Sequence, residues 1–146
     1  VFTADIKGDL SGIADPGSAT PKLEARLESL GLPLPSFEGN PVALWDLFGK
    51  TGVPVRMTVS EMGPLLLARL LDLNDTQTGV LYATFKIADD NGLLLLDLAD
   101  LRAMLAHVGA NAATLKLEYG NLSPTSIAAI QRSLLVLEEQ GADGVF

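Results

Sequence analysis

The sequence predicts an α/β protein in which a small strand-containing region is followed by a mainly helical one. Residues 1–6 are apolar and β-favouring, and a predicted helix and a second strand candidate follow them. This is the order of a βαβ unit. After residue 49, leucine-rich stretches repeat at helical spacing. We therefore expect residues 1–49 to form an α/β part and residues 50–146 to be mainly helical.

The predicted helix of the first part covers residues 20–30. Thr20 is a good N-cap, Pro21 suits the first helical position, and Gly31 stands where the helix should end. Its apolar residues recur on one face, at Leu23, Leu27 and Leu30. The second strand is expected within residues 42–47, with Trp45 packed in the core.

The second part predicts four helices. The start of the first helix is predicted by Thr58 and Glu61, which are three residues apart as in a capping box. The third follows a short apolar run and is capped by Asp97, and the fourth begins at Ser123 and stops at Gly141. The expected ranges are 59–72, 76–89, 97–108 and 124–140.

Composition bounds the function. The chain carries 10 Lys plus Arg against 18 Asp plus Glu, a net charge of −8, which argues against this segment gripping nucleic acid along its surface. It has no cysteine, which excludes thiol catalysis and thiolate metal sites, and one histidine, which makes a zinc site a poor prospect. These features, with no long apolar run, predict a cytoplasmic protein that does not span a membrane.

The first candidate site is the polar turn after the opening strand. Asp5, Lys7, Gly8 and Asp9 follow that strand, and ligands bind outside the carboxyl ends of strands in open α/β sheets. Two carboxylates, a lysine and a flexible glycine there could hold a nucleotide, a metal-bound water or a neighbouring loop. The alternative is a solvated turn with a local ion pair, which the spacing alone favours.

Two strings imitate parts of a nucleotide site. Leu93–Asp97 has four leucines before an aspartate, as in a strand that holds Mg²⁺ through water, but Asp97 is better placed to cap the next helix. Gly49-Lys50-Thr51 resembles the end of a phosphate loop, yet position 44 is leucine where the upstream glycine should stand. We interpret this second string as a turn, so the segment is not expected to bind ATP well on its own.

Two single side chains complete the set of candidates. Arg132, on the last predicted helix, could act in trans as an arginine finger in a ring of subunits. Solvation or an ion pair with Glu138 or Glu139 is the favoured alternative. His107 lies near a helix end, where an imidazolium suits the helix dipole better than a catalytic role.

Several strings resemble the YjgR-type branch of the HerA-like P-loop ATPases, in the HerA/FtsK superfamily. The match begins with Phe2-Thr3-Ala4-Asp5-Ile6-Lys7-Gly8-Asp9-Leu10-Ser11-Gly12 and is loose only over residues 13–41. It continues through the residues 54–71, 73–77, 94–98, 100–105 and 130–132.

This resemblance implies a RecA-like P-loop core that uses ATP with Mg²⁺, assembled as a homo-oligomer, often a hexamer. It implies that the chain is an internal part of a larger subunit, with the phosphate loop before Val1 and the Walker B strand after Phe146. Asp5, Lys7, Gly8 and Asp9 would then face the nucleotide side, and the helical region would be an insertion. DNA would be handled by the whole protein and not through this acidic segment.

A second hypothesis from a different class stays open. The chain contains no complete phosphate loop and has four predicted leucine-rich amphipathic helices, which could bury against partner subunits. The sequence is therefore also compatible with a non-catalytic helical interaction or oligomerisation module.

Overall fold

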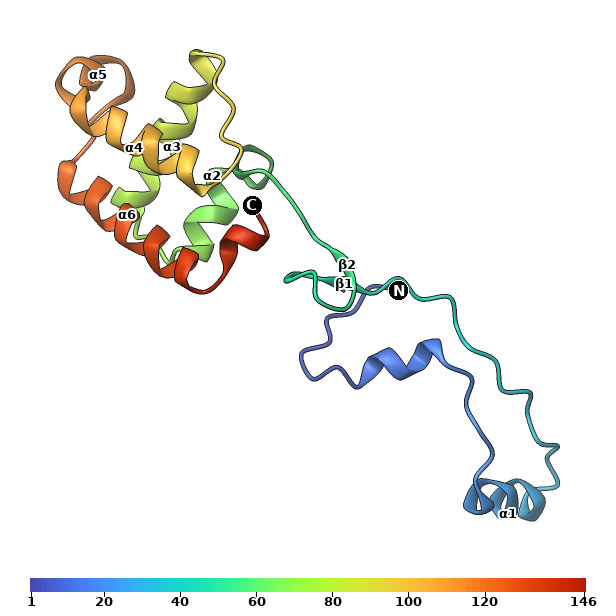
Figure 1. Cartoon of the computed structure of the whole chain (residues 1–146). Coiled ribbons are helices and arrows are strands. Elements are labelled where there is room, and N and C mark those ends of the chain that lie inside the picture. The colour runs from blue at the N-terminus through green and yellow to red at the C-terminus, as the bar shows by residue number, and fades with distance from the viewer. The chain divides into compact units, whose positions relative to one another are not determined.

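The computed structural model describes residues 1–146, which divide into two units, Val1–Trp45 and Asp46–Phe146. The protein is mainly helical, with six α-helices, two short 3₁₀ helices and one pair of two-residue strands (Figure 1). None of its helices has the length and apolar character that crossing a bilayer requires.

The first unit contains a 3₁₀ helix, Leu10–Ala14, and the helix α1, Pro21–Ser29. The start of α1 is as predicted, because the Thr20 hydroxyl accepts a hydrogen bond from the Leu23 amide at 3.3 Å. Gly31 follows the helix with φ 64°, a left-handed conformation that glycine adopts without steric cost. No residue of α1 is buried, so its leucine face joins no core within this unit.

The predicted opening strand is absent. Residues 1–6 form no strand and are all exposed, and no backbone hydrogen bond to another strand holds them. A strand needs a neighbouring strand for its N–H and C=O groups, and nothing in this chain supplies one to residues 1–6. The expected βαβ unit is therefore not formed within these residues.

The second predicted strand is reduced to β1, Trp45–Asp46, which pairs with β2, Val53–Pro54. The prediction that Trp45 packs in a core is wrong, because its side chain is 65% exposed. Its ring lies 6.1 Å from the ring of Phe2, in a tilted aromatic pair. Because no sheet packs against it, the indole remains largely exposed to solvent.

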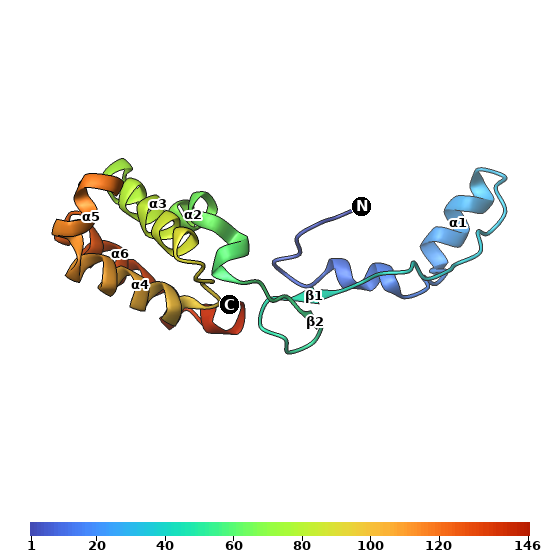
Figure 2. The ribbon, with the colours of Figure 1, turned by 90° about the horizontal axis from the view of Figure 1, so that it is seen from above.

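The second unit is a bundle of five helices with its own core (Figures 1 and 2). Helix α3 is central and packs against α2, α4 and α6. Figure 2 shows α2 and α3 on one side of the bundle and α4 and α6 on the other. The helices are α2 (Val59–Leu70), α3 (Asp75–Asp90), α4 (Leu98–Ala110), α5 (Ala112–Tyr119) and α6 (Pro124–Glu139), followed by a 3₁₀ turn (Ala142–Gly144).

Four of these helices start where the sequence predicted a cap. Thr58 and Asn74 each form a reciprocal capping box, with Glu61 and Gln77 respectively. The Asp97 carboxylate and the Ser123 hydroxyl each accept from a backbone amide three residues later. The predicted helices of this region are thus confirmed, with ends that differ by one or two residues.

The core of the bundle is made by one face of each long helix. Leucine and isoleucine side chains from α4 and α6 are fully buried where these helices meet. Burial of this kind is the main stabilising contribution in a helical bundle. The largest fully buried side chains are Leu67, Leu81, Ile87, Leu98, Leu101, Leu105, Ile130 and Leu134.

Helix α2 is interrupted near its start by Gly63 and Pro64. Gly63 has φ 72° and ψ 167°, a conformation that is essentially restricted to glycine. Proline next to it cannot donate the helical hydrogen bond and fixes its own φ. The pair therefore bends α2 between its capped start at Thr58 and the buried segment that contains Leu67.

The bundle begins and ends at one place. The Met57 amide, just before α2, donates a hydrogen bond of 2.9 Å to the carbonyl of Val145, at the end of the chain. The polypeptide therefore enters and leaves the helical unit at neighbouring points.

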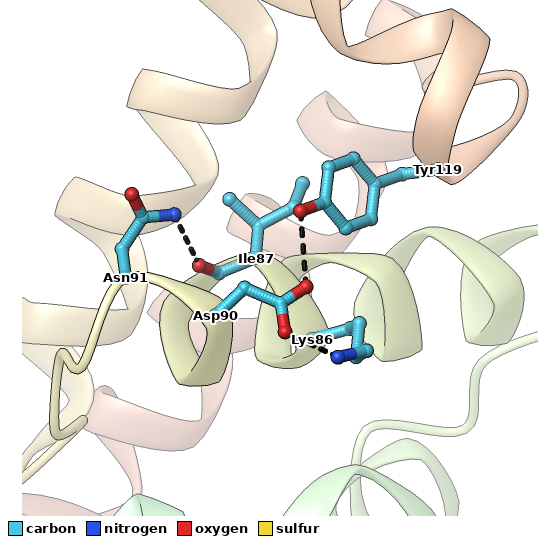
Figure 3. A network of polar contacts seen from close by, with 5 residues as sticks. All are labelled: Lys86, Ile87, Asp90, Asn91 and Tyr119. Carbon is cyan, nitrogen blue, oxygen red and sulfur yellow. Dashed lines mark hydrogen bonds and ion pairs between the residues drawn. The ribbon is translucent and has the colours of Figure 1, made fainter.

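Helix α5 was not predicted. It has no side-chain cap and no buried residue, so the sequence carries neither of the usual signals for it. Ala112 and Leu115 are partly buried against the core, and at the far end of the helix the Tyr119 hydroxyl donates to a carboxylate oxygen of Asp90 at 3.0 Å. Figure 3 shows that Asp90 also pairs with Lys86 on the same helix.

This contact predicts a measurable titration. The hydrogen bond to Asp90, with desolvation, raises the pKa of Tyr119 to about 12. In a Tyr82→Phe variant, Tyr119 is the remaining tyrosine, and its tyrosinate absorbance should rise around pH 12. The contact stabilises the fold fully below pH 10, the ordinary tyrosine pKa, and this is lost as pH rises through 12.

Adding Asp90→Asn to that variant should bring the midpoint back toward 10, the ordinary value. A midpoint already near 10 with Asp90 present would show that Tyr119 does not hold this hydrogen bond in solution.

Candidate functional site

The predicted site residues at the start of the chain form one tight turn. The Asp5 carboxylate accepts hydrogen bonds from the amides of Lys7 at 3.2 Å, Gly8 at 2.8 Å and Leu10 at 2.9 Å. Gly8 has φ 77°, which lets the chain fold back over the carboxylate. Asp5 and Gly8 thus shape the turn and lead the chain into the 3₁₀ helix at Leu10–Ala14.

The charge state of Asp5 follows from these contacts. Desolvation raises the pKa of Asp5, but the amide hydrogen bonds from Leu10, Gly8 and Lys7 outweigh it, so the pKa lies below its ordinary value. The ionised Asp5 carboxylate therefore already accepts hydrogen bonds from the backbone amides of its own turn.

Lys7 and Asp9 remain as the exposed charged groups of this turn. Neither takes part in an ion pair, because the two ion pairs of the structure join other residues. The expected local ion pair is therefore wrong. The turn presents Lys7 and Asp9 to solvent beside the Asp5 carboxylate, which stays charged and accepts hydrogen bonds from the amides of the turn.

The Gly49-Lys50-Thr51 string is a turn, as predicted. The side chain of Asp46 supplies the negative charge that its amides bind. The Asp46 carboxylate accepts from the amides of Lys50 at 2.7 Å and Thr51 at 2.9 Å, and from the Phe48 amide at 2.9 Å. The amide of Thr51, then that of Phe48, lowers the pKa of Asp46 to about 2. The amides that would cradle a phosphate are thus occupied by a side chain of the same loop.

The Leu93–Asp97 string serves the ends of two helices. The carbonyls of Leu95 and Leu96 accept from the amides of Ser60 at 2.8 Å and Val59 at 3.3 Å, at the start of α2. The Asp97 carboxylate accepts from the Asp100 amide at 2.8 Å and so caps α4. The prediction that Asp97 caps the following helix is therefore confirmed.

Arg132 is exposed on α6 and forms no ion pair. Of the two alternatives predicted for Arg132, solvation is confirmed and the ion pair is not formed, because Glu138 instead bonds Arg102 of α4 at 2.6 Å. Arg102 and Glu138 are 36 residues apart, so no local pattern in the sequence predicts this contact. His107 lies in the last turn of α4, the position expected for it at a helix end. Its ring nitrogen Nδ1 is 3.4 Å from the side-chain amide nitrogen of Asn111.

The described residues do not supply a complete site for ATP and Mg²⁺. No group of three or more histidine or acidic side chains could hold a metal ion. The phosphate-like loop is filled by Asp46, and the turn at Asp5 offers only Lys7 as a free cation.

One comparison with known proteins gives a match. A protein-family model described as "Helicase HerA-like C-terminal" covers residues 1–146. Comparisons with curated proteins and with solved structures found no match.

Proposed function

This chain belongs to the helicase HerA-like C-terminal family, and from that premise we propose that it is one part of a cytoplasmic, ATP-hydrolysing motor subunit of the YjgR-type branch. The observation that carries this proposal is the family match over the whole chain. The complete protein would use ATP with Mg²⁺, form a homo-oligomer and act on DNA through other surfaces, since this chain has a net charge of −8.

In this proposal residues 1–49 belong to the P-loop core and residues 50–146 are a helical region inserted in it or packed on it. The exposed, β-favouring residues 1–6 are then a strand whose partners come from other polypeptide. What supports this is the β-favouring composition of these residues, together with the family match that includes them.

The turn after that strand would lie at the nucleotide edge. Asp5 and Gly8 fix the backbone, as their hydrogen bonds and φ value support. Lys7 and Asp9 are left free to contact a phosphate or a metal-bound water. Arg132 is a further candidate, as an arginine that reaches a neighbouring subunit, and its exposure and lack of an ion pair are compatible with that role.

We expect Lys7→Ala and Asp9→Ala, each made in the complete motor subunit, to lower ATP turnover by about tenfold or more. Removing one group that stabilises transferred phosphoryl charge has effects of at least this size. Steady-state phosphate release measures it. Lys22→Ala is the matched control, since Lys22 is an exposed lysine of the same unit, and it should leave turnover unchanged.

Unchanged turnover in both variants would remove the site while leaving the family assignment in place. The chain 1–146 alone should show no thermal shift with ATP and Mg²⁺. A clear shift would contradict the incomplete-site interpretation and would also count against the second candidate function.

That second candidate is an interaction module built from the helical unit. The observation that favours it is an apolar surface on α2 that nothing in its own unit covers: Leu65, Leu66 and Leu70 are each about half exposed. A helical bundle gains nothing from three such leucines on one short helix unless they meet a partner.

A further inference from the structure

Asn91 stands where helix α3 ends, and the residue after it is a glycine. The carbonyl carbon of an asparagine side chain is open to attack by the backbone nitrogen of the next residue. Glycine hinders that attack least, because it has no Cβ. Asn91 and Gly92 are both exposed, so water reaches them. The asparagines that precede a residue other than glycine are Asn40, Asn74, Asn111 and Asn121.

The folded chain restrains both reacting groups. The side-chain amide of Asn91 donates a hydrogen bond of 2.7 Å to the carbonyl of Ile87, one turn back along α3 (Figure 3). The backbone amide of Gly92 donates one of 3.0 Å to the carbonyl of Asp89. While these two bonds last, the Gly92 nitrogen is not free to attack the side chain of Asn91. The reaction therefore requires the last turn of α3 to open first.

We propose that Asn91 is a site of spontaneous deamidation, that opening of the last turn of α3 sets its rate, and that the product holds this turn open. The Gly92 nitrogen loses its proton and bonds to Cγ of Asn91. The Cγ–Nδ2 bond breaks, and Nδ2 leaves as ammonia. Water then opens the cyclic imide. Cleavage of one imide C–N bond gives aspartate, and cleavage of the other gives isoaspartate, in which the main chain runs through the former side chain.

The product is poorly suited to the end of a helix. A carboxylate cannot donate to the Ile87 carbonyl, so the bond that closes the last turn is lost. Asp89 and Asp90 already precede this position, and the carbonyl end of a helix repels negative charge. The last turn of α3 contains no basic residue that would offset a third carboxylate. We therefore expect the turn to fray once Asn91 has reacted.

Fraying at this point reaches helix α2 through the segment that follows Gly92. The Leu93 amide donates to the carbonyl of Ala88 at 2.9 Å and so anchors that segment to the end of α3. The Leu95 amide donates to the Ser60 hydroxyl at 2.9 Å, and the Leu95 carbonyl accepts from the Ser60 amide at 2.8 Å. Deamidation should therefore loosen the start of α2 as well as the end of α3.

Ageing the chain tests the site and its control by the fold. Residues 1–146 are incubated at mildly alkaline pH, either folded or unfolded in urea, and peptide mass spectrometry follows the deamidation of each asparagine. Asn91 should be the first asparagine to react in both samples. Its rate in the folded chain should be lower than in urea by roughly tenfold or more, because the folded chain reacts only from its opened state.

Variants measure the effect of the product separately from the rate. Asn91→Asp carries the carboxylate of the product and should lower the Tm by about 4 °C or more. Asn91→Ala loses the donor without gaining a charge, so its Tm should fall between that of Asn91→Asp and that of the original chain. Asn121→Asp is the matched control, because Asn121 is exposed in the loop between α5 and α6. Its Tm should change by less than about 2 °C.

Hydrogen exchange shows where the bundle loosens. The amides of Leu93 and Leu95 should exchange faster in Asn91→Asp and in the aged chain, and should be unchanged in Asn121→Asp.

Each part of the proposal can be overturned. If another asparagine reacts before Asn91, or none reacts, Asn91 is not the site. Equal rates in the folded and unfolded chains show that the last turn of α3 does not control the reaction. If Asn91→Asp and Asn121→Asp melt and exchange alike, the product does not open the turn.

Discussion

Replacing Leu101 with alanine is expected to lower the free energy of unfolding by about 2–5 kcal/mol, the range for a buried leucine whose site cannot collapse. Leu101 is fully buried on α4, in the core of the bundle. The same change at Leu94, which is 72% exposed, removes the same atoms without opening a cavity and should cost less than about 0.5 kcal/mol.

Urea denaturation of the two variants measures this difference. If Leu101→Ala and Leu94→Ala unfold at the same midpoint, Leu101 does not lie in the core of the bundle. A change in slope for Leu101→Ala would instead show that the bundle has lost its two-state transition.

Two glycine-to-alanine changes should act with opposite signs. Gly63 has a positive φ and an extended ψ, so Gly63→Ala should destabilise the bundle by roughly 1–3 kcal/mol through backbone strain. Gly79 lies inside α3 with an ordinary φ and open space where the methyl group of alanine would stand. Gly79→Ala should therefore stabilise the bundle by about 0.5–1 kcal/mol.

Thermal melting of both variants checks the pair. Equal and small shifts would mean that α2 runs straight through Gly63 in solution, without the bend between Thr58 and Leu67.

The helices of the second unit could be predicted because their signals are local. Thr58 with Glu61, and Asp97 with Asp100, define helix starts within four residues. The leucine spacing then gives the buried face. Helix α5 could not be predicted in this way, because it has no side-chain cap and the hydrogen bond from Tyr119 joins it to Asp90, 29 residues away.

The opening strand could not be predicted correctly, because its formation depends on residues that are not local in the sequence. Its residues have strand propensity, but propensity is fulfilled only when a neighbouring strand is present, and none exists for residues 1–6 in this chain. The same applies to Trp45, whose expected burial needed a sheet to pack against.

For the two strings that resemble parts of a nucleotide site, the sequence predicted a turn at Gly49–Thr51 and a helix cap at Asp97, and the structure has both. The sequence did not predict the contacts that the two strings make. That Asp46 fills the amides of the Gly49–Thr51 loop, and that Leu95 and Leu96 cap α2, are consequences of chain folding that composition and spacing do not encode. The turn at Asp5 was foreseen, but its internal hydrogen bonds leave Lys7 and Asp9 as the groups to test.

The bond between Met57 and Val145 has a consequence for engineering. The two ends of the helical bundle lie next to each other, so the bundle can be circularly permuted. Joining these ends with a few glycines and opening the chain at the Asn91–Gly92 turn would give a permuted sequence with the same packing. For the same reason a short peptide could replace the whole bundle in a host protein without stretching the two points of attachment.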